Sequence, residues 1–229
     1  MHATALFGFI MKILFKNSDF LVALKPSGIP TQPDPTKDKD AMTYLSEILS
    51  ENGENSELWL IHRLDRVDSG LLVFARNKKS AKILSELAAN SGLQKGYLAV
   101  VEGKAEGGTL VDYLYKDSMS SKAYVCTSER RGAKKAELSY TLKAISENEG
   151  VIKSLVDIRL ITGRFHQIRA QFSSRGHSLS GDKKYGNRDG RAKSPALFAY
   201  SLKFELFGEK YEFSVMPDSS EYPWCLFDL

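Results

Sequence analysis

Apolar and polar positions change their period along the chain, and each period predicts a different element. Across Ser154–Ile161, apolar residues alternate with polar ones, which is the pattern of a half-buried strand. From Ala41 onward, Met42, Leu45 and Leu49 recur at helical spacing and predict an amphipathic helix. The chain therefore contains both strand and helix signals.

Two later segments carry a helical stripe as well. Asn77 is placed to cap a helix that continues to about Gly92, because its short polar side chain can accept a hydrogen bond from the first turn. Phe165–Ser174 is also predicted to be helical, and Gly176 is expected to end it.

Strands are predicted to outnumber helices and to follow one another directly. Thr109–Ala136 is polar and predicts an irregular segment. The other predicted strands lie at Lys12–Leu24 (two strands around a turn), Leu58–Ile61, Leu71–Ala75, Tyr97–Val101, Ser139–Ile145, and Leu197–Leu206 with Lys210–Val215 as a hairpin around Gly208. This order favours an α+β fold with a largely antiparallel sheet. No linker separates two domains, so we expect a single domain over residues 12–229 after an N-terminal extension at residues 1–11.

The composition fits a folded protein that tolerates a polyanionic partner. The 229 residues are 42% hydrophobic, enough for one sizeable core, and the net charge is +4. Cys126 and Cys225 form no CxxC pair, which indicates reduced thiols in a cytoplasmic protein and no zinc site. The apolar start is too short to span a bilayer and lacks a basic leader, so Met1 or Met11 could begin the chain.

A polar loop, His62–Gly70, lies between two predicted apolar strands and carries the clearest candidate chemistry. Arg63 and Arg66 flank Asp65, and nearby cations favour an ionised carboxylate, which can act as a nucleophile. From these residues alone, a surface ion pair of little energetic value is an alternative. A divalent ion shared by Asp65 and Asp68 is another, although the sequence supplies no clear third ligand.

This loop and four further segments resemble, in order, the motifs of the RluA-type pseudouridine synthases. His62–Ala75 resembles the family's HRLDRxTSGLLxFA sequence. The other similar segments are Lys25–Gly28 (KPxG), Lys95–Gly103 (KxYxAxVxG), Thr162–Arg169 (TGRxHQIR) and Gly181–Gly186 (GDxxYG). Two residues depart from the pattern, since Asp68 replaces a usual Thr and Gln171 a frequent His.

The resemblance implies the α+β pseudouridine synthase fold, with a mixed, mainly antiparallel sheet, flanking helices and a central catalytic cleft. It implies isomerisation of uridine to 5-ribosyluracil in a structured stem-loop of ribosomal or transfer RNA, with flipping of the target base. The reaction breaks the N1–C1′ bond and joins C5 to C1′ without redox change, so we expect no cofactor and no metal. We also expect a cytoplasmic monomer without membrane association and, because few residues precede Lys25, without the N-terminal S4 module of many relatives.

By the same resemblance, Asp65 is the catalytic carboxylate, whether it attacks C1′, adds to the base or takes a C2′ proton. Tyr97 stacks on the flipped uracil and serves the proton transfer from C5, and Arg169 pairs with the aspartate. Arg63 enters the RNA stack in place of the target nucleotide, and Ile168 packs against the uracil. The expected phosphate contacts are Lys25, Arg66, Lys95, Arg164 and His166.

Three other functions remain as alternatives. A protein that keeps the cleft but only binds RNA would retain the basic residues without turnover. A metal-dependent phosphodiesterase would use Asp65 and Asp68. A small-molecule hydrolase would need a GxSxG or Cys/His arrangement that the sequence lacks.

Overall fold

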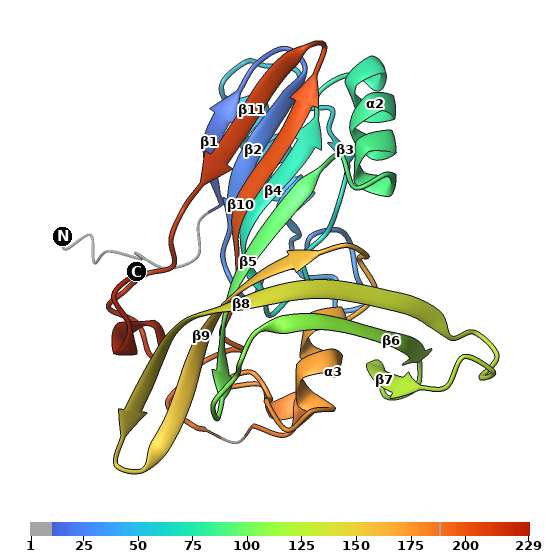
Figure 1. The fold of residues 1–229 in the computed structure, drawn as a ribbon. Helices are drawn as coiled ribbons and strands as arrows, with labels where there is room; N and C mark the ends of the chain where they lie inside the picture. The colour runs from blue at the N-terminus through green and yellow to red at the C-terminus, as the bar shows by residue number, and fades with distance from the viewer. Residues whose placement is uncertain (1–10, 188) are drawn as a thin grey trace. The chain divides into compact units, whose positions relative to one another are not determined.

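The computed structural model, drawn in Figure 1, describes residues 11–187 and 189–229. The contacts within it form two compact units. The first unit ends at Asn90 and the second begins at Ser91. The extension expected at residues 1–11 lies outside the described residues except for Met11, which is buried. A single catalytic domain over residues 12–229 stays a prediction.

The first unit is a small antiparallel sheet with two helices. Strand β2 pairs with β1 on one side and with β4 on the other, and β3 also pairs with β4. Its elements are β1 (Lys12–Lys16), β2 (Phe20–Lys25), α1 (Ala41–Glu51), β3 (Trp59–Leu60), β4 (Ser69–Ala75) and α2 (Lys78–Ala89). Strands β2 and β4 are buried along nearly their whole length, which explains why their sequences are continuous apolar runs.

Local capping residues begin both helices of the first unit. The Asp40 carboxylate accepts hydrogen bonds from the backbone N–H groups of Met42 and Thr43 at the start of α1. The Asn77 side chain accepts one from the N–H of Ser80 at 2.8 Å. Each cap satisfies donors that the first turn would leave unpaired, and the predicted cap at Asn77 is confirmed.

The second unit is a larger antiparallel sheet in the order β11–β10–β5–β9–β8–β6–β7 (Figure 1). Its strands are β5 (Gln94–Glu102), β6 (Gly108–Asp117), β7 (Lys122–Cys126), β8 (Lys134–Asn148), β9 (Val151–Leu160), β10 (Leu197–Leu206) and β11 (Glu209–Ser214). Its helices are α3 (Gln167–Ser173) and the short 3₁₀ turns η1 (Lys183–Tyr185) and η2 (Trp224–Leu226).

The hairpin of β10 and β11 is confirmed. It turns at Phe207 and Gly208, whose φ angles of 54° and 84° suit a two-residue hairpin turn.

The segment Thr109–Ala136, predicted to be irregular, is instead mostly β-structure. It forms β6, β7 and the beginning of β8. Only one face of these strands is buried, where Leu114, Ala123 and Ala136 pack with Ala170 of α3. Small and sparse apolar positions are enough on such a face, so the sequence shows little hydrophobic periodicity. In the described part of the chain, no helix combines the length and apolar character that a membrane span requires.

Candidate active site

Hydrogen bonds from the segment that follows β2 hold the backbone of the loop that carries Asp65. Leu64 is buried, and its backbone carbonyl and N–H both bond the Thr31 hydroxyl, at 2.7 and 3.2 Å. The Ser27 hydroxyl donates to the carbonyl of Val67 at 2.7 Å. These bonds fix the backbone on both sides of Asp65, whose side chain stays half-buried.

A buried lysine lies behind this loop. Lys25 has 0% exposed surface, and its ammonium donates to the carbonyls of Pro26, Ile29 and Arg66 at 2.9, 2.8 and 3.3 Å. Burial lowers the pKa of Lys25 to about 8, and the negative charges of Asp68 and Asp65 oppose that fall. This burial argues against the expected phosphate contact and gives Lys25 the role of fastening the Asp65 loop.

The depressed pKa of Lys25 makes a testable prediction about stability. The unfolded chain holds the lysine proton up to about pH 10.5 and the folded chain only up to about pH 8, so the unfolded state binds the extra proton between these values. The free energy of unfolding contributed by Lys25 therefore rises with pH across that window, by up to about 1.4 kcal/mol per pH unit. Urea unfolding of wild type and Lys25→Met should show a difference that grows from pH 8 to pH 10.

A matched control separates this effect from general alkaline destabilisation. Lys12, an exposed lysine on β1, offers it as Lys12→Met. A wild-type minus Lys25→Met difference that stays flat with pH, like that of the control, would contradict the depressed pKa.

The two arginines beside Asp65 differ in exposure and in hydrogen bonding. Arg63 is exposed. The guanidinium of Arg66 instead bonds Asp38 and the Thr36 hydroxyl, and so joins the Asp65 loop to the loop before α1. Contact between Arg66 and RNA stays a prediction.

In the second unit, Tyr97 lies in β5, between β9 and β10, and is 6% exposed. Its neighbour Gly96 faces the other side of the sheet, because side chains alternate along a strand. A Cβ at Gly96 would lie 2.1 Å from Arg159 Nη1 and 2.9 Å from Tyr200 Cε1. Glycine therefore lets two large side chains lie flat against the strand beneath Tyr97.

Arg169 lies on α3 and forms a buried ion pair that was not predicted. Its Nε and Nη2 both donate to the carboxylate of Asp182, each at 2.7 Å. Asp182 belongs to the Gly181–Gly186 motif, which the sequence identifies without giving the aspartate a role. An aspartate inside a motif shared with an enzyme family is the signal that could have pointed to it.

The helix α3 begins later than predicted, and its first residues are buried. His166 precedes the helix with a left-handed φ of 51°, stacks on Phe165 at 3.8 Å and places Nδ1 3.0 Å from the Tyr185 hydroxyl. This burial argues against a phosphate contact by His166. Ile168 is also buried, as a residue of a pocket floor or of the core would be.

Besides Arg66, two of the expected phosphate contacts keep some surface. Arg164 is exposed, and its Nε donates to the carbonyl of Lys135 at 2.9 Å. Lys95 is half-buried, and that burial lowers its pKa. In the basic loop between β7 and β8, Arg130 covers the ring of Tyr115 at 3.8 Å.

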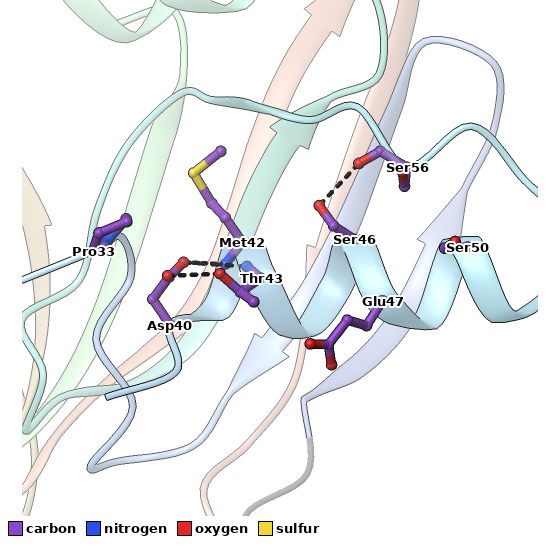
Figure 2. Close-up of a pocket in the computed structure, with 8 residues that line it drawn as sticks. All are labelled: Pro33, Asp40, Met42, Thr43, Ser46, Glu47, Ser50 and Ser56. Carbon is purple, nitrogen blue, oxygen red and sulfur yellow. Dashed lines mark hydrogen bonds between the residues drawn. The ribbon is translucent and has the colours of Figure 1, made fainter. Parts of the chain in front are cut away.

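A shallow hollow of about 480 Å³ lies along α1 and contains none of the predicted catalytic residues (Figure 2). Figure 2 shows that its polar groups serve the helix itself, since Asp40 caps the first turn and Ser46 donates to the carbonyl of Ser56. Among residues 11–187 and 189–229, no three His, Cys, Asp or Glu side chains gather as a metal ion would require.

Comparison with known proteins identifies the family. The profile described as RNA pseudouridylate synthase matches residues 19–174. An uncharacterised RNA pseudouridine synthase of Mycoplasma genitalium is 33% identical over 231 residues, covering 93% of this chain and 68% of the relative. One from Bacillus subtilis is 32% identical over 197 residues, covering 84% and 63%. Ribosomal large subunit pseudouridine synthase D of Borreliella burgdorferi is 28% identical, covering 92% and 65%. The chain thus spans about two thirds of the length of these curated relatives.

Solved structures agree on the fold. Human RNA pseudouridylate synthase domain containing 1 matches with a TM-score of 0.75 and 24% identity, over 96% of this chain and 87% of that one. Human RNA pseudouridylate synthase domain containing 4 matches with a TM-score of 0.73 and 21% identity, over 90% and 89%. These likenesses confirm the predicted α+β pseudouridine synthase fold. The profile match, which extends over more than half of the chain, shows that the chain belongs to the RNA pseudouridylate synthase family, in the RluA-type group that its motifs predicted.

Proposed function

We propose that this chain isomerises uridine to 5-ribosyluracil in RNA, with Asp65 as the catalytic carboxylate. The family match over residues 19–174 carries the proposal, because it includes the whole loop around Asp65. The geometry of that loop supports it. The backbone is anchored at Leu64 and Val67, so the carboxylate is held on a rigid support while Arg63 stays exposed for the RNA.

The roles of the other residues follow from the same proposal. Exposed Arg63 can stack in the place that the flipped nucleotide leaves, which offsets part of the few kcal/mol that flipping costs. Tyr97 offers a ring face to the uracil and a hydroxyl for the proton on C5. Arg169 is the partner that keeps the Asp65 carboxylate ionised, and Ile168 contributes apolar contact to the base.

The substrate is ribosomal or transfer RNA, and the relatives favour the first. Those from Borreliella burgdorferi and Zymomonas mobilis are named as ribosomal large subunit pseudouridine synthases. Of the expected phosphate contacts, Arg164 is exposed and Arg66 and Lys95 keep part of their surface for binding of this kind. We propose that the protein acts as a monomer in the cytoplasm, without cofactor or metal.

Tritium release tests the activity without knowledge of the target site. Formation of the C5–C1′ bond must expel the hydrogen from C5, so RNA labelled there with tritium should lose label to water when the chain is added. RNA from cells that lack the modification is the substrate. Release should persist in the presence of a chelator, which separates isomerisation from the metal-dependent phosphodiesterase alternative. RNA that binds tightly but keeps its label would instead support the binding-only alternative.

A further inference from the structure

The ion pair of Arg169 and Asp182 is almost completely buried. Asp182 has 0% exposed surface and Arg169 4%. The carboxylate receives both Arg169 bonds, and its Oδ1 also accepts the N–H of Tyr185 at 3.2 Å. Removing two charges from water is costly, and an apolar pair is often at least as stable. The pair therefore calls for a reason beyond stability.

The ring of Tyr185 packs against the same guanidinium. Its ring centroid lies 5.1 Å from Arg169 Cζ, a cation–π contact. Its hydroxyl accepts the N–H of Ala123 in β7 at 2.7 Å and lies 3.0 Å from His166 Nδ1. The ring is thus fixed at its far end by a neighbouring strand and by the residue before α3.

Glycines shape the turn that carries Asp182 and Tyr185. Gly181 has a φ of 79°, which residues with a side chain rarely adopt, and a Cβ there would lie 2.5 Å from the backbone oxygen of Ser194. Both the backbone conformation and the lack of space therefore exclude a larger residue. Gly186 has a φ of 107° and ends the 3₁₀ turn. The Asn187 side chain accepts the N–H of Gly181 at 2.9 Å and closes the loop on itself.

We propose that Asp182 and Tyr185 are positioning residues that fix the Arg169 guanidinium for the isomerisation. The inference rests on the proposed function, from which Arg169 takes its catalytic role. A guanidinium is planar, with five N–H donors in a fixed fork. Two bonds to one carboxylate, together with a ring beneath, set the plane and direction of the whole group. Asp182 thereby determines where the remaining donors of Arg169 point.

Single-turnover kinetics of Asp182→Asn test this. With folded enzyme in excess over labelled RNA and at a concentration well above the Kd, the rate constant of tritium release depends on the geometry of the folded enzyme and not on the fraction that folds. Asparagine has nearly the shape of aspartate, but it carries no charge and has only one acceptor oxygen. It therefore cannot accept both Arg169 hydrogen bonds as the carboxylate does. We expect the rate constant to fall roughly 10- to 100-fold, because small misplacements of a catalytic group have effects of this size. The Kd for RNA should change less than about twofold, since Asp182 is remote from solvent.

The control is a second bidentate pair beside the same helix. Arg175 donates to the Asp112 carboxylate through Nη1 and Nη2, at 2.9 and 3.1 Å, and Gln171 also bonds it. Asp112→Asn removes a bidentate pair that is more exposed than that of Asp182, without touching Arg169. It should lower the melting temperature and leave the single-turnover rate constant unchanged. If Asp182→Asn behaves like this control, its role is structural and the inference is overturned.

Two further variants complete the test. Tyr185→Phe keeps the ring beneath Arg169 and is the substitute if Asp182→Asn does not fold. Loss of the hydroxyl bonds should lower the rate constant at least about threefold at unchanged Kd, and an unchanged rate constant would overturn the inference.

Arg169→Lys reports on the proposed function itself. A wild-type chain without activity would refute that function. An Arg169→Lys chain as fast as wild type would refute the catalytic role of Arg169 and the inference with it, whereas an active, Arg169-dependent chain indifferent to Asp182 would refute only the positioning role.

Discussion

Asp65→Asn is expected to abolish isomerisation, with the single-turnover rate constant of tritium release lowered by more than about a thousandfold. Asparagine keeps the size of the side chain but can neither attack a carbon atom nor accept a proton as a carboxylate does. The backbone bonds that hold the loop come from Thr31 and Ser27 and do not involve the Asp65 side chain. The substituted loop should therefore keep its shape, and the Kd for RNA should change less than about threefold.

The control for this experiment is an exposed carboxylate of the same unit. Glu47 lies on α1 and pairs with Lys39 at the surface. Glu47→Gln removes one negative charge as Asp65→Asn does, yet it should leave the rate constant at the wild-type value. Turnover by Asp65→Asn above a few per cent of wild type would contradict a catalytic carboxylate at this position.

The elements that the sequence predicts best are those whose signals are local. Asn77 caps α2 with a bond to a residue three positions later, so the pattern contains all the needed information. Gly208 likewise fixes the hairpin of β10 and β11 through its own backbone conformation. The segment that forms β6 and β7 has no such local signal. Its buried face is covered by α3, which comes far later in the chain, and a sequence window cannot show that.

The candidate site divides in the same way. The Asp65 loop could be found because its sequence matches a family motif except at Asp68 and its two flanking strands are continuous apolar runs. The role of Lys25 could not, since an exposed lysine that binds phosphate and a buried one that binds three carbonyls look the same in sequence. The pairing of Arg169 with Asp182 depends on a turn whose geometry two glycines permit, which is again a property of the folded chain.

Tyr97→Phe is expected to slow the chemistry by about a hundredfold or more and to leave the Kd for RNA within about twofold. Phenylalanine retains the ring face that stacks on uracil, and the buried position in β5 tolerates it because only the hydroxyl is lost. What disappears is a group that can take the proton from C5, and a positioned acid or base contributes roughly 10²- to 10⁴-fold. Single-turnover tritium release, which follows that hydrogen directly, measures the loss.

Tyr200→Phe is the matched control, because Tyr200 lies in the neighbouring strand β10 and uses its hydroxyl to bond Asp157 at 2.9 Å and Arg159 at 2.8 Å. It loses a partly exposed polar network without a proposed part in the chemistry, so it should affect stability and leave the rate constant unchanged. The two tyrosines then separate proton transfer from packing. A rate constant in Tyr97→Phe equal to that of wild type would show that Tyr97 only stacks on the base, and the proton from C5 would need another acceptor.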